Sequence, residues 1–201
     1  MLISIRDVTH IYSENVRALN QVDLNIEENE FIGLVGHTGS GKTTLVQMFN
    51  GLIKPTDGKV IVCGVDINSD KNNSKSIRKK IGLVFQYPEY QLFEETIYDD
   101  IAFGPRNLDV EENEIENRVK EALELVEMDY EKYRERSPFN LSGGQQRKVA
   151  IAGVLAMNPQ VLILDEPTAG LDPQGRNKLL NLLYQLHHRY NKTIILISHR
   201  M

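Results

Sequence analysis

Short apolar runs separated by polar turns predict a series of strands in the first part of the chain. Leu2–Val8, Val22–Ile26 and Phe31–Val35 are runs of strand length, divided by acidic or Asn-rich turns. Lys59–Cys63 and Ile81–Phe85 are further apolar runs of the same kind. We expect a strand at each of these places.

Helical periodicity begins after a glycine-rich loop and dominates the middle of the chain. We expect a helix from about Lys42 to Asn50, with Gly51 as its C-cap. Between Val110 and Met128, apolar residues recur at helical spacing among charged and amide side chains. This apolar stripe could be a docking face, but packing against the core is the simpler interpretation.

Strands and helices alternate toward the end of the chain. A helix should begin after Ser142, and Val161–Leu164 has the pattern of a buried strand. Gln174–Tyr190 is an amphipathic helix, and Thr193–Ile197 is the last predicted strand. This alternation implies a parallel sheet with helices on both faces. The segment Val110–Met157 is predicted to be helical throughout, as an insert on that core.

Composition narrows the possible partners. The 201 residues include 23 basic and 28 acidic side chains, a net charge of −5, whereas nucleic-acid binders carry a basic surplus or stripe. The dense basic cluster Lys75–Lys80 is interpreted as a solvated helix face, so nucleic acid is disfavoured as the main partner. Cys63 is the single cysteine, which excludes an intrachain disulfide. The sequence has neither an apolar run of about 20 residues nor a signal peptide, so a membrane role requires a partner.

A phosphate-binding loop is the strongest chemical signal. Gly36–Thr43 fits the pattern Gly-x-x-x-x-Gly-Lys-Thr between a predicted strand and a predicted helix, although a plain glycine-rich turn is the alternative. Glycines free backbone N–H groups to surround phosphate oxygens, and the following helix N-terminus adds positive charge. Lys42 would reach the β- and γ-phosphates, and the Thr43 hydroxyl would bind Mg²⁺. The residues expected to bind nucleotide are Gly36, His37, Thr38, Gly39, Ser40, Gly41, Lys42, Thr43 and Thr44.

Two later segments carry acidic and glycine-rich signals. The run Val161–Leu164 ends in Asp165 and Glu166, and the carboxyl end of a parallel strand faces the ligand crevice. Asp165 would hold Mg²⁺ through water, and Glu166 would orient or deprotonate the attacking water. Leu141–Gln145, which reads Leu-Ser-Gly-Gly-Gln, precedes a helix, so Ser142 alone could be an ordinary N-cap.

The order of these segments resembles the ABC ATPase family over the whole chain. Further matches are Gln86 at the Q-loop, Pro167 after the acidic pair, Thr168–Asp172 at the D-loop, His199 at the switch histidine and Tyr12 at the adenine-stacking aromatic. The resemblance implies catalytic roles for Glu166, His199, Gln86 and Lys42, and Mg²⁺ binding by Thr43, Gln86 and Asp165. Tyr12 and His199 each keep a purely structural alternative.

The resemblance also implies an architecture and a working unit. The fold would be α/β: a P-loop NTPase (RecA-like) core with a parallel sheet and flanking helices, an N-terminal antiparallel β subdomain and an inserted α-helical signature subdomain. Residues 1–201 would form one ABC transporter nucleotide-binding domain, with the helical insert at about 90–157. ATP and Mg²⁺ are the implied cofactors. Each ATP would lie between the phosphate loop of one subunit and Ser142, Gly143, Gly144 and Gln145 of the opposing subunit.

Two further segments are similar to energy-coupling-factor (ECF) transporter ATPases. They are Tyr87–Leu108, which begins with an aromatic and apolar stretch beside a flexible loop, and Val149–Met157. Such ATPases pair with a second ABC ATPase, identical or paralogous, at the cytoplasmic face of the cell membrane. Their other partners are a transmembrane coupling subunit and a membrane substrate-binding subunit, and they drive uptake of a vitamin or a transition-metal ion. Gly36–Gly39 and Phe93–Thr96 favour the second of the two ATPase types. The aromatic stretch Tyr87–Thr96 has the composition of a protein-docking groove, and local packing of the helical insert is the alternative.

Two other functions stay open on sequence grounds. One is a soluble ABC ATPase that remodels nucleic acid or ribosomes, which the acidic balance and the single cassette disfavour. The other is a nucleotide-binding regulator without turnover, which the intact catalytic set disfavours. The chain departs from the family at Arg200, beside His199, and it stops at Met201 where family members continue. We therefore expect the family's C-terminal portion to be absent, with dimerisation and turnover of this chain left open.

Overall fold

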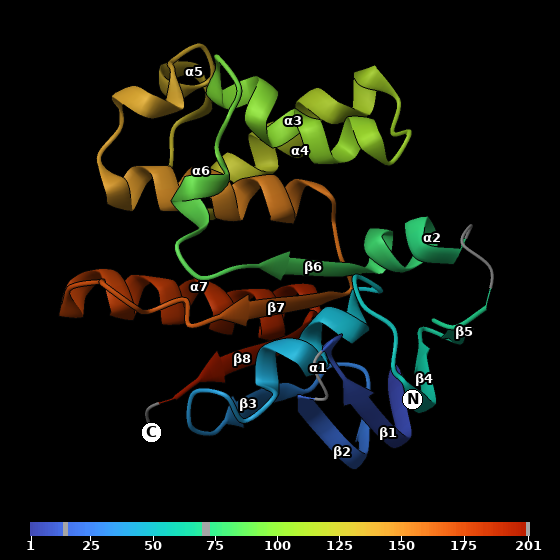
Figure 1. Ribbon diagram of the computed structural model, residues 1–201. Helices are drawn as coiled ribbons and strands as arrows, with labels where there is room; N and C mark the ends of the chain where they lie inside the picture. The colour runs from blue at the N-terminus through green and yellow to red at the C-terminus, as the bar shows by residue number, and fades with distance from the viewer. Residues whose placement is uncertain (14–15, 70–72, 200–201) are drawn as a thin grey trace.

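The fold combines two β-sheets with a separate layer of helices. A computed structural model describes residues 1–13, 16–69 and 73–199. Within these residues the strands form an antiparallel sheet in the order β2-β1-β4-β5 and a parallel sheet in the order β3-β8-β7-β6 (Figure 1). The antiparallel sheet contains β1 (Ile3–Ile11), β2 (Arg17–Ile26), β4 (Asp57–Val62) and β5 (Val65–Asp66). The parallel sheet contains β3 (Phe31–Val35), β6 (Ile81–Val84), β7 (Val161–Asp165) and β8 (Thr193–Ser198).

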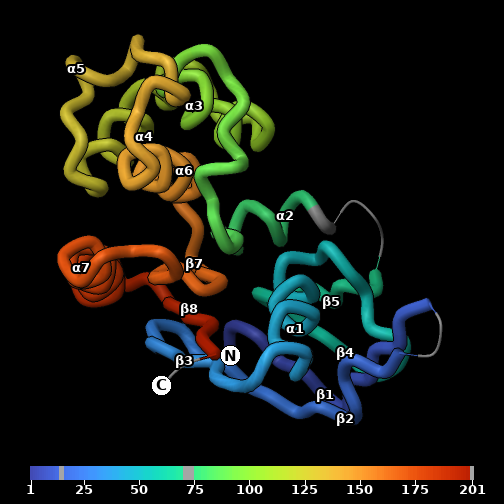
Figure 2. The backbone as a smooth tube through the Cα atoms, turned by 60° about the vertical axis from the view of Figure 1, so that its left-hand side comes forward, coloured from blue at the N-terminus to red at the C-terminus, as the bar shows by residue number. Residues whose placement is uncertain are grey.

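The helices fall into two groups. Helix α1 (Lys42–Phe49) lies between the two sheets, and α3 to α6 gather in a layer on the far side of the parallel sheet from the antiparallel one (Figures 1 and 2). The other helices of the described chain are α2 (Asn73–Lys80), α3 (Ile97–Asn107), α4 (Glu112–Leu125), α5 (Tyr130–Tyr133), α6 (Gly143–Ala156) and α7 (Pro173–Tyr190), with 3₁₀ turns η2 (Pro88–Gln91) and η3 (Pro138–Asn140). This arrangement confirms the predicted fold class.

Strand β7 separates two hydrophobic cores. Its side chains alternate between the faces of the sheet, as strand geometry requires. Leu162 and Leu164 pack with the helical layer and α7, whereas Val161 and Ile163 pack with α1 and the antiparallel sheet. All four are buried, which explains why this strand is a continuous apolar run rather than an alternating one.

Several element boundaries differ from the sequence predictions for local reasons. Strand β2 begins at Arg17 rather than Val22, because the pairing continues past an irregularity near Gln21, whose φ is positive. Helix α3 lies within the helical insert of about 90–157 that the family resemblance implied, but the residue pattern did not mark it as a helix, since its Gly104 and Pro105 are ordinarily helix breakers. The C-cap of α1 is Asn50, and Gly51 follows it with a φ of 66°.

The prediction that Val110–Met157 is helical throughout was wrong. Helix α5 is four residues long, and a 3₁₀ turn with flanking irregular residues connects it to α6. Proline at position 138 has no N–H group to continue an α-helix, and it begins this turn. In the described parts of the chain, no helix has the length and apolar character that crossing a bilayer requires.

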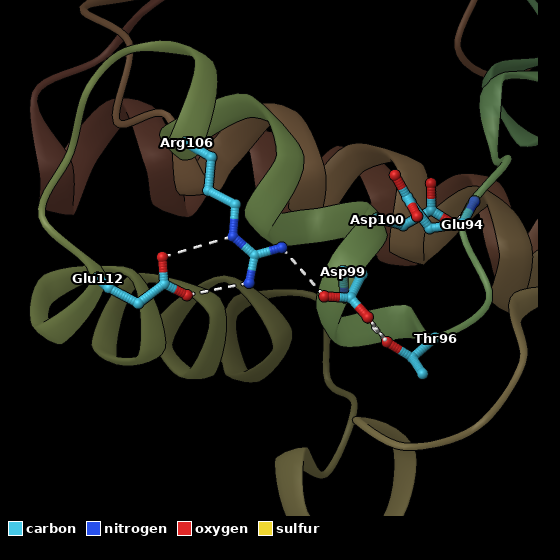
Figure 3. Close-up of polar contacts among 6 residues, drawn as sticks. All are labelled: Glu94, Thr96, Asp99, Asp100, Arg106 and Glu112. Carbon is cyan, nitrogen blue, oxygen red and sulfur yellow. Dashed lines mark hydrogen bonds and ion pairs between the residues drawn. The ribbon is translucent and has the colours of Figure 1, made fainter.

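A polar cluster fixes the start of α3 (Figure 3). The Thr96 side chain caps the helix by accepting a hydrogen bond from the Asp99 N–H at 3.1 Å, and its hydroxyl donates to the Asp99 carboxylate at 2.6 Å. Arg106 bridges Asp99 at 3.0 Å and Glu112 of α4 at 2.9 Å. Asp100 accepts hydrogen bonds from the backbone of residues 93 and 94. The cluster therefore ties α3 to α4 and to the segment that precedes it.

The pKa of Asp99 gives this cluster a measurable signature. The Thr96 hydroxyl, and after it Arg106, lower that pKa, so the ionised carboxylate stabilises the folded state. A lowered pKa gives stability that is present above the unfolded-state pKa and lost as the pH falls through the folded-state pKa. Because Asp99 is partly exposed, we expect Asp99→Asn to cost about 1 kcal/mol or less at pH 7. Urea unfolding of both proteins at falling pH should show the difference shrinking below the ordinary carboxyl range, and a constant difference would contradict this assignment.

Candidate active site

The phosphate loop joins the end of β3 to the start of α1. Gly41 has a φ of 88°, and a Cβ there would lie 2.5 Å from the Ala18 carbonyl oxygen, so only glycine fits. The buried Lys42 amine lies inside the loop and donates to the carbonyls of Gly36 at 2.7 Å and His37 at 2.8 Å. It also contacts the Ser40 hydroxyl at 3.2 Å. The loop thus holds a cation at its centre next to a helix N-terminus, which is the arrangement that phosphate binding requires.

Four elements bring polar side chains together at the carboxyl edge of the parallel sheet. The Thr43 hydroxyl on α1 donates to the Asp165 carboxylate at the end of β7, at 3.2 Å. The Gln86 amide, just past β6, donates to Glu166 at 3.4 Å. His199, just past β8, contacts the other oxygen of Glu166 through Nδ1. These five side chains were all singled out from the sequence, and the structure places them in one continuous cluster.

The two carboxyl groups of the acidic pair have different surroundings. Burial raises the pKa of Asp165, the Thr43 hydrogen bond opposes that shift, and the neighbouring Glu166 charge adds to it. Glu166 has a φ of 47°, a left-handed conformation that turns the chain sharply after the strand. Its side chain is 18% exposed, so it is reached from the open side of the sheet edge.

Mg²⁺ fits this cluster as an ion shared with other oxygens. The described residues contain no group of three or more His, Cys, Asp and Glu side chains that could hold a metal by themselves. Thr43, Asp165 and Gln86 offer the oxygen ligands that Mg²⁺ prefers, and Mg²⁺ is ordinarily bound by few protein groups together with water and phosphate. The donor set is therefore suited to a metal that arrives with a nucleotide.

Tyr12 lies beside the phosphate loop and is held there. Its hydroxyl shares a 3.1 Å hydrogen bond with the Thr44 hydroxyl, and its ring meets the His10 ring edge-on with centroids 4.6 Å apart. Tyr12 remains 40% exposed, which leaves it accessible for stacking. Sequence reasoning missed the contribution of His10, although a spacing of two along a strand would have placed it on the same face as Tyr12.

The Leu-Ser-Gly-Gly-Gln segment opens α6 on the helical layer, apart from the elements that carry the phosphate loop. Ser142 is the N-cap, and it forms a capping box with Gln145: the Gln145 N–H donates to the Ser142 hydroxyl and the Ser142 N–H donates to the Gln145 side chain. Ser142 therefore does act as an ordinary N-cap, the structural alternative to a nucleotide-binding role. A Cβ at Gly143 or Gly144 would meet nothing within 4 Å, so the first turn of α6 is open on its outer side.

Several predicted positions stand outside this geometry. His37 is exposed, and its ring is within hydrogen-bond distance of the Thr38 carbonyl, whereas its own carbonyl accepts from Lys42 inside the loop. Gly39 has a φ of 82°, and a Cβ there would meet nothing. Arg200, which departs from the family pattern, lies outside the described residues.

Comparison with known proteins identifies the family. The family model described as ABC transporter matches residues 19–169. The chain belongs to the ABC transporter family. This result confirms the resemblance drawn from the phosphate loop, the Leu-Ser-Gly-Gly-Gln segment and the acidic pair.

Relatives in the ABC transporter family include energy-coupling factor transporter ATP-binding proteins. The protein named EcfA2 of Clostridium tetani is 58% identical over 205 residues, covering 100% of this chain and 71% of that protein. EcfA2 of Bacillus subtilis is 52% identical over 186 residues, covering 92% and 67%. Both names agree with the second of the two ECF ATPase types, which the sequence favoured.

Solved structures of ABC cassettes share the fold. The structure of cbiO1 from Clostridium perfringens, described as part of the ABC transporter complex cbiONQ, superposes with a TM-score of 0.88 at 39% identity, covering 99% of this chain and 78% of that one. The ATP-binding cassette MJ0796, a dimer in a post-hydrolysis state with ADP and Pi, gives 0.86 at 34% identity, covering 99% and 88%.

The first prediction about the site itself concerns the cation inside the phosphate loop. Lys42→Ala removes the amine that the loop holds at its centre, so we expect MgATP affinity to fall about tenfold or more, which corresponds to about 1.4 kcal/mol per tenfold step. Equilibrium titration with a fluorescent ATP analogue measures the change. Lys54→Ala, which alters an exposed lysine bonded to the Asn68 carbonyl, is the control and should bind normally. Normal binding by Lys42→Ala would refute the site.

Proposed function

We propose that this chain is the ATP-binding and ATP-hydrolysing subunit of an ECF-type importer. It would couple ATP hydrolysis to uptake of a vitamin or a transition-metal ion through transmembrane partners. The observation that carries the proposal is the cluster of Thr43, Gln86, Asp165, Glu166 and His199 beside a complete phosphate loop. Family membership and the names of the relatives support the transport role.

The chemistry follows from where each group lies. The phosphate loop and Lys42 bind the phosphate chain, and Tyr12 supplies a ring on which the adenine stacks. Thr43, Asp165 and Gln86 would hold Mg²⁺, which offsets the charge of the phosphates when it is bound. Glu166 orients and deprotonates the attacking water, and His199, in contact with Glu166, is placed to reach the γ-phosphate. Positioning and charge compensation therefore account for most of the catalysis.

A second ATPase subunit completes the site. The N–H groups of Ser142 and Gln145 are used in the capping box. Gly143 and Gly144 open helix α6 on its uncovered side, where the first-turn N–H groups have no acceptor within the helix and can donate to an anion. We infer that this helix end binds the γ-phosphate held by the opposing subunit, so that ATP joins two positive helix ends. Loss of the γ-phosphate removes the shared charge and loosens the dimer. The dimeric form of the similar cassette MJ0796 supports this arrangement.

Exposed aromatic side chains mark the surface for the membrane partner. We call Tyr87, Tyr90, Phe93 and Phe103 the docking surface; Tyr90 is 83% exposed and Phe93 is 56% exposed. Phe93 and Phe103 contact each other edge-on at 4.8 Å, so local packing accounts for part of their placement. This local contact still leaves much of each aromatic side chain exposed. A cluster of exposed apolar side chains is typical of a protein–protein contact surface. We therefore propose that the subunit is peripheral and binds at the cytoplasmic face of the membrane. The layer formed by α3–α6 is consistent with a helical subdomain of about 90–157.

The second prediction tests the catalytic carboxylate. Glu166→Gln keeps the size of the side chain but cannot accept the proton of the attacking water, so turnover should fall about 100-fold or more while MgATP still binds. Because the γ-phosphate persists, the variant should accumulate as a closed dimer with ATP, visible by light scattering after size-exclusion chromatography. Glu28→Gln, an exposed substitution away from the sheet edge, is the control. Undiminished hydrolysis by Glu166→Gln would remove Glu166 from its role.

The third prediction tests the membrane partner. The tagged protein, purified from detergent-solubilised membranes of its own cells, should carry polytopic membrane subunits that mass spectrometry identifies. Tyr90→Ser combined with Phe93→Ser should reduce their recovery about tenfold, because the anchoring rings of an interface contribute most of its affinity. Tyr184→Ser removes another exposed ring, 61% exposed on α7, and should recover the companions normally. Recovery of a ribosome or a nucleoprotein instead of membrane subunits would favour the remodelling alternative.

A further inference from the structure

Arg147 has a buried guanidinium in which each of the three nitrogens donates a hydrogen bond. Among the described residues, the charged side chains with the least exposure are Lys42, inside the phosphate loop, and Arg147, on α6. Arg147 Nε and Nη2 donate to the two carboxylate oxygens of Glu89, each at 3.0 Å. Its Nη1 donates to the backbone carbonyl of Ala169 at 2.8 Å. The fork therefore binds two different segments at once, which a lysine amine cannot reproduce.

The three connected segments belong to different parts of the proposed machine. Glu89 lies on η2, the turn that carries the exposed Tyr90 of the docking surface. Arg147 lies one turn into α6, whose first turn contains Ser142 and Gly143. Ala169 lies in the turn after the acidic pair, and its N–H donates to the Glu166 carbonyl at 3.0 Å. The Arg147 side chain thus connects the turn that carries part of the docking surface, the turn that follows Glu166, and α6, which we call the signature helix because the Leu-Ser-Gly-Gly-Gln segment opens it.

Burial makes this link resistant to partial breakage. The side chains of Arg147 and Glu89 are 8% and 15% exposed, so neither charge can exchange its partner for bulk water. A buried ion pair that loses one member leaves an uncompensated charge, which is far more costly than moving both members together. A displacement of η2 that keeps the pair intact would therefore also displace Arg147, and with it α6 and the Ala169 carbonyl.

We propose that Arg147 is a positioning residue that couples the docking surface to the turn behind Glu166 and to the signature helix. This inference rests on the proposed function, since it requires a partner that moves η2. Arg147 contacts neither nucleotide nor the reacting atoms in this scheme; it sets where the Ala169 turn and the start of α6 lie when the partner docks. Sequence reasoning missed it, because Arg147 and Glu89 are 58 positions apart and no spacing rule joins them.

The fourth prediction measures the link in the protein without its partner. The Ala169 and Leu171 amides donate within the turn, so their hydrogen exchange reports its stability. Glu89→Gln should accelerate exchange at both amides about fivefold or more, although residue 89 lies on another segment. In an Arg147→Lys background, Glu89→Gln should add less than about twofold, because the route is already cut. Equal acceleration in both backgrounds would overturn the inference.

Arg118 supplies a matched control in the same helical layer. It also binds one carboxylate, Glu114, at 2.6 Å and one backbone carbonyl, Ala156, at 3.5 Å. Arg118→Lys should leave the Ala169 and Leu171 amides unchanged, and an equal effect there would show general loosening rather than a specific link. If Arg147→Lys does not fold, Glu89→Gln alone decides the matter, since unchanged exchange at the two amides would refute the coupling.

Kinetics of the assembled complex separate positioning from simple structural support. Arg147→Lys in the complex captured from membranes should lower kcat about fivefold or more with the KM for ATP changed less than about twofold, and Arg118→Lys should change neither. A raised KM with normal kcat, or a normal kcat, would overturn the positioning role. If no membrane subunits are captured but Glu89→Gln still accelerates exchange at Ala169 and Leu171, the proposed function is refuted and this inference is not. If membrane subunits are captured but Glu89→Gln leaves exchange unchanged, this inference is refuted and the proposed function is not.

Discussion

The parallel pairing of four strands is the constraint on which the site depends. Because β3, β6, β7 and β8 all run in the same direction, their carboxyl ends lie at one edge of the sheet. The register is direct: Asp165 lies opposite Ile197 of β8, which places His199 just beyond the same edge. Thr43 and Asp165, 122 positions apart in sequence, come within hydrogen-bond distance for this reason. The catalytic cluster is thus a consequence of topology before it is one of side-chain chemistry.

Strand β7 gives that edge its rigidity. It is the strand whose two faces serve two separate cores, so a shift along its axis would disturb the helical layer and the antiparallel sheet together. The acidic pair follows directly from this strand, and its position is therefore among the least adjustable in the molecule. By contrast, Gln86 and His199 lie just past the ends of β6 and β8, outside the regular strands. Both reach Glu166 from these neighbouring strands, so the position of the acidic pair on β7 sets where the cluster forms.

The sequence predicted the strands of the parallel sheet and the residues of the cluster, because both depend on local patterns. An apolar run buried on two faces has a recognisable composition, and the phosphate loop needs particular residues at particular spacings. Helix α3 escaped prediction from the residue pattern because Gly104 and Pro105 are tolerated in it through tertiary packing, which propensity cannot anticipate. The contacts of Arg147 with Glu89, and of Tyr12 with Thr44, escaped for another reason. They join segments whose proximity exists only after the chain has folded.

These long-range contacts bear on how one subunit can serve two ATP sites. The phosphate loop and the Leu-Ser-Gly-Gly-Gln segment lie on different layers of the chain, so under the proposed function another subunit must supply the second half of each site. Coordination then requires a physical connection between the layers, and packing alone between a helical layer and a sheet permits sliding. A buried, forked ion pair permits much less, because its geometry is specific and its rupture exposes a charge to a dry interior. Arg147 forms this ion pair with Glu89 and also bonds the turn after Glu166. In our proposal, coupling from the docking surface to that turn therefore depends on one side chain rather than on the whole contact between the helical layer and the sheet.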